Sequence, residues 1–335
     1  MLEIDTEIET WPLRHHFTIS RGTRTEISVV VARIRDGDLV GQGECFPHSR
    51  YNEDVESTAQ AIRSLAPQLA AGIDRQQLLD VMPAGAARNA IDCALWDLQA
   101  KRAQRTAPET RAWSIAGLEA FPSLNTVMTI SIDAPAAMAA AAAKAAREGY
   151  RHLKVKLGSG DGDDNQRISE IRGAAPAATL IVDANEGCRP DALEGHLVAM
   201  HQAGVSMVEQ PLPAGDDEGL ESTSSPVPIG ADESCHTSAD LQRLIGKYNV
   251  VNIKLDKAGG LTEALRMAAT AKHLGFDLMV GCMLGTSLAM APATIVAGQA
   301  SYVELDGPLW LAGDRAAPID FDAGRMSAFS SKLWG

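Results

Sequence analysis

The sequence has few of the features that cross-link a protein through disulfides or target it for export. Its cysteines are odd in number, lie far apart and form no Cys-x-x-Cys pair; they are Cys45, Cys93, Cys188, Cys235 and Cys282. This usage argues against a disulfide framework and predicts reduced thiols, so we expect a cytoplasmic protein. The opening residues MLEIDTEIETWPL carry acids early and lack a basic stretch followed by an apolar one, so we expect no targeting peptide.

Positive charge is also in short supply. The 335 residues include 30 Lys and Arg against 43 Asp and Glu, a formal net charge of −13, with no basic run. Nucleic acids and anionic membranes require a basic surface, so neither is an expected partner. One uncharged stretch, 278–303, is long enough to span a bilayer, but glycines and Pro292 interrupt it and no basic residues flank it. We expect a buried strand followed by a buried helix there.

Several catalytic signatures are missing as well. The sequence has no GxGxxG motif after a predicted strand, no P-loop, no HExxH and no GxSxG. Their absence argues against the dinucleotide-binding, P-loop, zinc-protease and α/β-hydrolase classes. With 45% hydrophobic residues, the chain has material for a full core in one large or two medium domains.

What is present divides the chain into two patterns. The first 120 residues predict strands and then helices, an α+β arrangement: strands at 2–10, 27–34 and 39–43, helices at 55–69 and 86–102. Beyond them, short apolar runs alternate with helical stretches such as 135–148 and 261–274. Eight such runs are candidate strands: 127–132, 153–157, 180–182, 207–208, 228–230, 250–255, 278–280 and 302–305.

The spacing of these eight runs indicates how they are arranged. Positions near their C-terminal ends are separated by 27, 27, 26, 23, 22, 28 and 24 residues, each gap fitting one strand and one helix. Near-constant repeats of this size are typical of a closed parallel (β/α) barrel, and an open doubly wound sheet is the alternative.

Three consecutive strands end in acids. Asp183 follows LIV, Glu209 follows MV, and Asp232 follows PIGA. In a parallel barrel these ends lie side by side at the active face, where three carboxylates repel one another unless a cation is present. An all-oxygen site without His or Cys favours Mg²⁺ over zinc. The alternative is that each acid caps a helix or pairs with a lysine.

Lysines flank these acids. Lys154 and Lys156 share one face of the second strand, and Lys254 ends the sixth, roughly opposite in an eight-stranded ring. Neighbouring ammonium groups and low-dielectric walls lower a lysine pKa, so we expect lysines able to act as bases; salt bridges to the acids are the alternative. A base and an acid on opposite faces of a carbon next to a metal-bound carboxylate can perform a 1,1-proton transfer, through an enediolate, with inversion.

With these motifs, the chain resembles the enolase superfamily in its muconate-lactonizing subgroup. The likeness covers nearly the whole chain: GQGEC and IDCALWDLQAKR, then KVK, VDAN, VEQP, ADES, NIKLDKAGG and VGCMLGTS. It implies an α/β fold, an enolase-type modified TIM barrel at 121–315 with an N-terminal α+β capping domain at 1–120, to which a C-terminal segment, 316–335, returns. It also implies that Lys156 and Lys254 are the two acid/base catalysts and that Lys154 supports Lys156. One Mg²⁺ per subunit is expected, with Asp183, Glu209 and Asp232 as its ligands.

The last strand points to the substrate. Glu304 and Asp306 lie on one face by the period of two, and two further acids beside a metal site call for a cation such as a substrate ammonium. The segment ELDGPLWLAGD resembles dipeptide epimerases, in which two acids hold the free amino terminus, with Glu304 standing where that pattern has Asp. The resemblance implies epimerisation of L-Ala-L-Glu or a related cell-wall dipeptide at its C-terminal residue. Alternatives are o-succinylbenzoate synthase, N-succinylamino acid racemase, muconate cycloisomerase, or a metal-binding relative without catalysis.

Other residues are candidates for the substrate pocket. The resemblance places the loop 18–24 over the barrel mouth, where an arginine fork suits a side-chain carboxylate; Arg24 is the first candidate and Arg21 the second. Thr129 and Cys282, and Thr286 beyond it, are further candidates. The histidines His15, His16 and His48 show no ligand spacing and are interpreted as surface or capping-domain residues. Members of this family often associate, so homo-oligomerisation is an expectation by analogy.

Overall fold

The first third of the chain is an antiparallel sheet packed against helices. The computed structural model describes residues 1–107 and 109–335. Strands β1 (Glu3–Ile19), β2 (Gly22–Asp36) and β3 (Leu39–Cys45) pair in that order. They are followed by α1 (Val55–Ser64), α2 (Ala66–Ala70), α3 (Arg75–Val81), α4 (Ala86–Gln104) and α5 (Ala112–Ile115). The glycines of GQGEC let β3 lie against α4, because a Cβ at Gly41 or Gly43 would collide with the α4 backbone.

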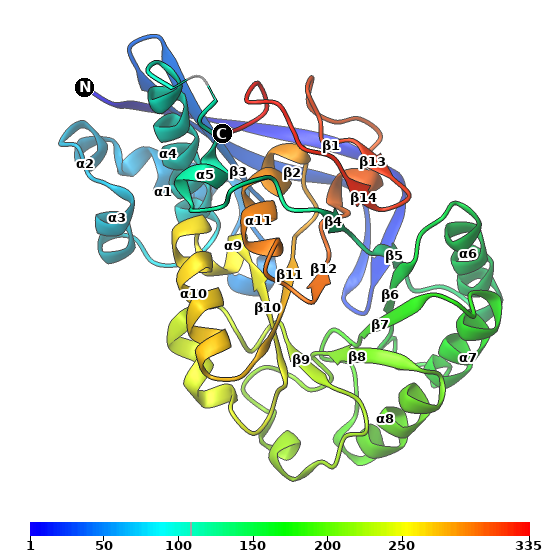
Figure 1. Ribbon diagram of the computed structural model, residues 1–335. Coiled ribbons are helices and arrows are strands. Elements are labelled where there is room, and N and C mark those ends of the chain that lie inside the picture. Colours follow the sequence, from blue (N-terminus) through cyan, green and yellow to red (C-terminus); the bar gives the residue numbers. More distant parts are fainter. Residues whose placement is uncertain (108) are drawn as a thin grey trace.

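Eight parallel strands form the second part (Figure 1). In chain order they are β5 (Met128–Ile130), β6 (His152–Lys156), β7 (Thr179–Asp183), β8 (Val205–Glu209), β9 (Ile229–Ala231), β10 (Val250–Lys254), β11 (Asp277–Gly281) and β12 (Tyr302–Val303), each hydrogen-bonded to the next. The first and last strands also meet, since the N–H of Val127 donates to the carbonyl of Val303 at 2.9 Å. The predicted eight-stranded (β/α) barrel is therefore confirmed, and the open sheet is excluded.

Helices cover the outside of the strands. They are α6 (Pro135–Arg147), α7 (Asp164–Ala174), α8 (Leu193–Gln202), the short α9 (Leu255–Ala258), α10 (Leu261–His273) and α11 (Ser287–Ala297). The connections after β8 and β9 carry only 3₁₀ turns, Glu218–Ser222 and Ser238–Leu244; two others are Ser49–Tyr51 and Pro190–Ala192, and one more, Gly307–Trp310, follows β12. The uncharged stretch 278–303 forms β11, α11 and β12, as expected. Among the described residues, no helix is long and apolar enough to cross a membrane.

Apolar side chains close the end of the barrel opposite the strand C-termini. They come from early positions in their strands and contact one another inside the ring: Val127, Ile181, Met207, Val250 and Met279, with Tyr302 packed against them. The polar residues at the strand C-termini therefore have a solid apolar floor beneath them.

The chain end lies against the first part of the molecule. A small sheet joins β13 (Phe321–Asp322) and β14 (Arg325–Met326) to β4 (Leu124–Asn125). Beyond it, the buried Trp334 donates its indole N–H to the carbonyl of Cys93 in α4 at 3.0 Å, and the N–H of Gly335 donates to Asp97 at 2.8 Å.

Candidate active site

The three strand-end acids lie next to one another. Asp183 ends β7 and is in register with Glu209, which ends β8; Asp232 directly follows β9. All are buried, with exposed fractions of 0%, 0% and 2%. Burial and then repulsion from Asp183 raise the pKa of Glu209. The sequence expectation that these acids crowd together is thus met by the geometry.

Two lysines approach the acids from strands on opposite sides. Lys156 Nζ of β6 lies 2.6 Å from Asp183 Oδ2, and Lys254 Nζ of β10 lies 2.7 Å from Asp232 Oδ2. Burial alone would lower the pKa of Lys254, but the charges of Asp232 and then Glu304 outweigh burial and hold it well above its ordinary value. The expectation of a lowered pKa for this lysine is therefore wrong for the protein groups alone, because the acids act more strongly than the neighbouring ammonium groups.

Lys154 lies beneath these pairs. Its ammonium is fully buried and forms ion pairs with Asp183 (3.0 Å), Glu209 (2.7 Å) and Glu304 (2.6 Å). Those contacts place it at the centre of the acids, and no contact with Lys156 is among them.

The acids offer the donor set of a hard divalent cation, since every donor is a carboxylate oxygen. As the side chains stand, no three His, Cys, Asp or Glu groups among the described residues converge to hold a metal ion, because Asp183 and Asp232 each turn an oxygen toward a lysine. Glu209 Oε2 and Asp232 Oδ1 are buried and accept no well-formed hydrogen bond, although lysine ammonium groups lie within ion-pair distance. The residues fit such a cation in their chemistry.

A fourth lysine, which the sequence analysis did not single out, fixes Asp232. Lys257 in α9 lies three residues after Lys254, and its ammonium is 2.6 Å from Asp232 Oδ1. It also donates to the backbone carbonyls of Asp232, Cys235 and Asn252 at 2.5, 2.8 and 3.1 Å. Asp232 is thus held between two lysines, one on each oxygen. The second lysine of the motif NIKLDKAGG is the sequence feature that could have identified Lys257.

The acids after β12 have different partners. Glu304 Oε1 lies 2.6 Å from Lys154 Nζ, whereas its Oε2 is buried without a hydrogen bond. Asp306 Oδ2 accepts the backbone N–H of Thr129 at 2.9 Å and the indole N–H of Trp310 at 3.4 Å. Both acids line the same cavity, as the period of two predicts. The structure corrects one premise: the cation nearest Glu304 is a lysine of the protein.

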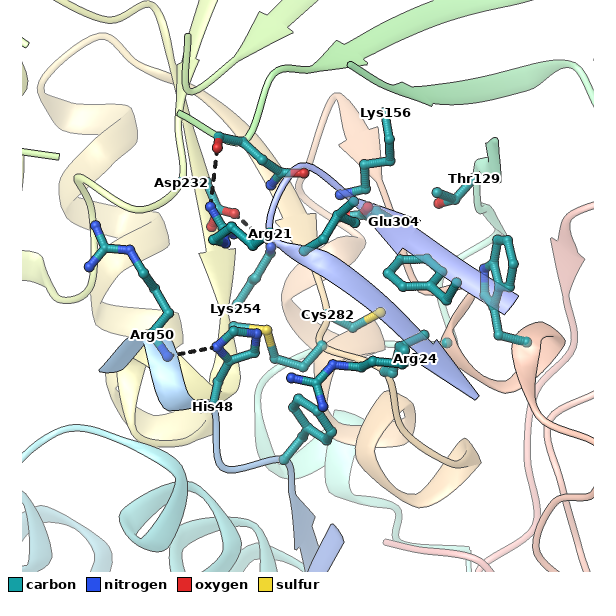
Figure 2. Close-up of a pocket in the computed structure, with 18 of the residues that line it drawn as sticks. Arg21, Arg24, His48, Arg50, Thr129, Lys156, Asp232, Lys254, Cys282 and Glu304 are labelled. Carbon is teal, nitrogen blue, oxygen red and sulfur yellow. Dashed lines mark hydrogen bonds and ion pairs between the residues drawn. The ribbon is translucent and has the colours of Figure 1, made fainter. Parts of the chain in front are cut away.

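A cavity of about 420 Å³ lies above these groups. Its floor is formed by barrel residues, including Thr129, Lys156, Lys254 and Cys282, and its roof by residues of β1, β2 and the loop after β3 (Figure 2). Thr286 does not line it; its side chain accepts the N–H of Leu288 at the start of α11. The strand ends that carry the candidate catalytic residues are thus covered by residues from both parts of the molecule.

The two candidate arginines differ in their contacts. Arg21 donates to Glu233 at 2.8 Å and to the carbonyl of Asn185 at 3.2 Å, and pairs with Glu186 at 3.3 Å. The guanidinium of Arg24 lies over the Phe46 ring at 5.3 Å and, within the described part of the chain, makes no hydrogen bond or ion pair. Arg24 is therefore the arginine whose donors are available in the cavity.

Other residues of the cavity roof were not predicted from the sequence. Arg50 donates to both oxygens of Glu186, at 3.0 and 2.8 Å, which ties the loop after β3 to the end of β7. His48 belongs to the first part of the chain, as interpreted, and it also lines the cavity, which the sequence did not predict. Burial, followed by the charges of Arg24 and Arg21, lowers the pKa of His48 to about 4. His15 and His16 are exposed on β1, as expected.

Family models match both parts of the chain. The model described as "Mandelate racemase / muconate lactonizing enzyme, N-terminal domain" matches residues 1–108, and the one described as "Enolase C-terminal domain-like" matches residues 137–330. Two similar proteins cover almost the same length. The L-Ala-D/L-Glu epimerase of Escherichia coli K12 is 46% identical, covering 95% of this chain and 97% of its own. The N-acetyl-D-glutamate racemase of a Pseudoalteromonas species is 44% identical, covering 92% and 95%.

Solved structures agree with these matches. An enolase family member from Agrobacterium tumefaciens with homology to dipeptide epimerases, solved with bound sodium and L-Ala-L-Glu, has a TM-score of 0.95 and 46% identity over 100% of both chains. The dipeptide epimerase of Enterococcus faecalis, complexed with Mg and L-Leu-L-Tyr, has a TM-score of 0.90 and 27% identity over 99% of this chain and 98% of its own.

Proposed function

The chain belongs to the mandelate racemase / muconate lactonizing enzyme family of the enolase superfamily, and we propose that it is a Mg²⁺-dependent dipeptide epimerase that interconverts L-Ala-L-Glu and L-Ala-D-Glu. The observation that carries this proposal is the pair Lys156 and Lys254, which contact the outer two of the three strand-end acids, Asp183 and Asp232, from opposite sides of the barrel. Two bases facing each other across one carbon are what inversion at that carbon requires.

In the proposed reaction one lysine removes the α-proton of the C-terminal residue and the other returns a proton to the opposite face. Lys156 and Lys254 have these roles, and Lys154 holds its charge among the acids beneath them. When bound by Asp183, Glu209 and Asp232, Mg²⁺ supplies positive charge that stabilises the substrate carboxylate as negative charge develops. The cavity roof excludes water from the reacting carbon.

Substrate recognition is proposed for residues at the two ends of the cavity. Arg24, whose donors are available, binds the side-chain carboxylate of the C-terminal Glu. Asp306 and Glu304 meet the amino end of the dipeptide, beside Thr129 and Cys282, while Arg21 holds the roof through Glu233. The name and ligand of the two most similar proteins described above support Ala and Glu as the residues of the substrate.

We also propose the division of the chain into a capping domain at 1–120, a catalytic barrel at 121–315 and a returning segment at 316–335. The cysteines support a cytoplasmic location, because all five are free in the structure. Recycling of cell-wall peptides is the setting that an Ala-Glu dipeptide suggests. Association into a homo-oligomer is proposed by analogy with the family.

The test is proton NMR of the purified protein with Mg²⁺ and L-Ala-L-Glu in D₂O. We expect the Glu α-proton signal to disappear while the second diastereomer accumulates. Neither Lys156→Ala nor Lys254→Ala should epimerise, and each should retain α-proton exchange for only one diastereomer, because one base remains. Lys247→Ala, which removes a lysine paired with Asp217 away from the cavity, is the matched control.

The outcomes separate the alternatives. Full activity in either active-site variant would contradict the two-lysine mechanism. If the wild type exchanges no α-proton in any dipeptide of a panel, the succinyl and muconate reactions become the leading alternatives. If the protein binds Mg²⁺ but shows no reaction with any of these substrates, it is the metal-binding relative without catalysis.

A further inference from the structure

Glu304 has a counter-ion inside the protein. Its Oε1 lies 2.6 Å from the ammonium of Lys154; the lysine is 0% exposed and the glutamate 5%. Lys154 is on β6 and Glu304 follows β12, and β5 lies between these two strands in the barrel. The acid must therefore reach past one strand to form this pair, and the extra methylene of a glutamate, compared with an aspartate, supplies the reach.

The end of β11 leaves room for this long side chain. Gly281 is the last residue of β11, and a Cβ at that position would lie 2.9 Å from Glu304 Oε2 and 2.7 Å from Asn252 Oδ1. Asn252 in turn donates its amide to Glu209 Oε1 at 2.6 Å. A glycine here thus lets the Glu304 carboxylate and a partner of a candidate metal ligand lie side by side.

The ammonium that contacts Glu304 also contacts two candidate metal ligands. Lys154 Nζ lies 3.0 Å from Asp183 Oδ2 and 2.7 Å from Glu209 Oε2. A divalent cation that binds these two carboxylates competes with Lys154 for their charge. One positive charge is shared among three acids, so the pull of Glu304 weakens the hold of Lys154 on the other two.

We propose that Glu304 is a positioning residue for the metal site: it holds Lys154 and thereby leaves Asp183 and Glu209 freer to bind Mg²⁺. The inference rests on the proposed function, in which those two acids are metal ligands. Glu304 acts through the lysine and does not bind the metal itself. Because Glu304 also lines the cavity (Figure 2), at the end assigned to the substrate amino group, one carboxylate serves both the metal site and substrate recognition.

The experiment is calorimetric titration of the metal-free protein with Mg²⁺ in the absence of substrate. Glu304→Gln removes the charge that faces Lys154, and we expect the Kd for Mg²⁺ to rise by about ten-fold or more, within the usual range for coupled sites. Glu304→Asp keeps the charge but shortens the side chain, so that it no longer reaches Lys154. We expect this variant to raise the Kd by at least about five-fold, through the loss of reach alone.

Asp306→Asn is the matched control. Asp306 is a buried acid two residues further along the chain that lines the same cavity, and it forms no ion pair within the described part of the chain. Its neutralisation measures the general effect of removing a negative charge from this region. We expect it to raise the Kd for Mg²⁺ at least about three-fold less than Glu304→Gln does. Thermal unfolding of each metal-free variant checks its fold.

The outcomes are distinct. A Kd for Glu304→Asp equal to that of the wild type would overturn the inference, because charge without contact would then suffice. Equal increases in Glu304→Gln and Asp306→Asn would overturn it as well. In both cases, epimerisation of L-Ala-L-Glu by the wild type leaves the proposed function intact. A wild type that binds no Mg²⁺ would instead overturn the metal site of the proposed function, and this inference with it.

Discussion

At the scale of single residues, Lys257 is notable because it fixes the position of Asp232. Its buried ammonium lies against one oxygen of Asp232 while Lys254 contacts the other, and it also donates to two backbone carbonyls in the turn after β9 and to that of Asn252 in β10. Lys257 is thereby a positioning residue: it shares the charge of Asp232 and leaves Lys254 less tightly held. A proton-transferring lysine must leave its ion pair, so this sharing favours the reaction.

Lys257→Met tests that role. Asp232 would pair with Lys254 alone, so we expect the α-proton exchange of the diastereomer facing Lys254 to slow by about ten-fold or more, while exchange of the other diastereomer changes less. Exchange of each pure diastereomer in D₂O, followed by NMR, measures this asymmetry. Lys247→Met, which breaks an ion pair with Asp217 elsewhere, is the control. Equal slowing of both diastereomers would indicate a structural role only.

Arg24→Ala tests the side-chain carboxylate site. We expect KM for L-Ala-L-Glu to rise by about ten- to hundred-fold, as for the loss of a charged hydrogen-bonding pair, with little change for L-Ala-L-Met, which has no second carboxylate. Steady-state kinetics with both dipeptides measure the difference. Arg21→Ala should affect both dipeptides alike, because Arg21 is occupied by Glu233. A substrate-selective effect in Arg21→Ala would exchange the two assignments.

The residues predicted from the sequence are those whose position depends on chain direction and periodicity alone. Asp183, Glu209 and Lys254 follow from strands that end on one side of a barrel. The Lys154–Glu304 pair could not be predicted, because it joins β6 to the residues after β12, past the intervening β5, and depends on side-chain reach. His48 was missed for a similar reason: its loop folds over the mouth from the first part of the chain.

At the scale of elements, α10 is capped by a residue from another helix. Asp92 of α4 is fully buried and accepts the N–H of Thr262 at 2.9 Å and its hydroxyl at 2.6 Å, at the first turn of α10. Gly260 precedes that turn with φ of 117°, and a Cβ there would lie 2.5 Å from Asp92. The glycines of KAGG thus permit two helices from different parts of the chain to meet at a shared cap.

This cap predicts a pH dependence of stability. Burial raises the pKa of Asp92 from 3.8 to about 6, so the folded state binds this proton more tightly than the unfolded state. The contribution of Asp92 to stability should therefore be greatest below pH 4 and fall as the pH rises toward 6. Asp92→Asn keeps a cap without the charge, and its stability relative to wild type should increase over this range by up to roughly 3 kcal/mol.

Urea unfolding of both proteins between pH 4 and 7 measures this difference. Asp54→Asn, at the exposed N-terminal cap of α1, is the control: hydrogen bonds from Ser57 lower the pKa of Asp54, so any trend should run in the opposite direction. A difference between Asp92→Asn and wild type that stays constant with pH would contradict the buried-charge argument.

Element boundaries show where local patterns fall short. The helix expected at 55–69 is two helices, α1 and α2, because Pro67 lies in the first turn of α2 and Leu65 separates the two. The strand expected at 2–10 continues to Ile19, because β2 supplies hydrogen-bond partners along most of that length. Partners distant in sequence, and not local propensity, set both the extra length and the small sheet formed by β4, β13 and β14.

At the scale of the whole molecule, the cavity exists only because two parts of the chain are held together. Arg315, beyond the 3₁₀ turn that follows β12, pairs with Glu44 of β3 at 2.6 Å and Glu9 of β1 at 2.7 Å, and donates to Thr286 at the start of α11 at 2.9 Å. The roof residues are on the elements that these contacts fix, so the position of the roof above the strand ends depends on them. Stability and substrate binding are therefore linked through this junction.

The chain terminus adds a second junction, away from the cavity. Trp334 is 0% exposed and packs beside α4, where its indole bonds to Cys93. Trp334→Ala should lower the free energy of unfolding by about 3–5 kcal/mol, as for other buried aromatic side chains, while Trp334→Phe, which keeps most of the packing but not the N–H donor, should lower it by about 1 kcal/mol. Urea unfolding measures both. Because Trp334 does not line the cavity, kcat and KM of the fraction that remains folded should be unchanged. A change in KM at temperatures where Trp334→Ala is fully folded would show instead that this terminus also positions the roof, as Arg315 does.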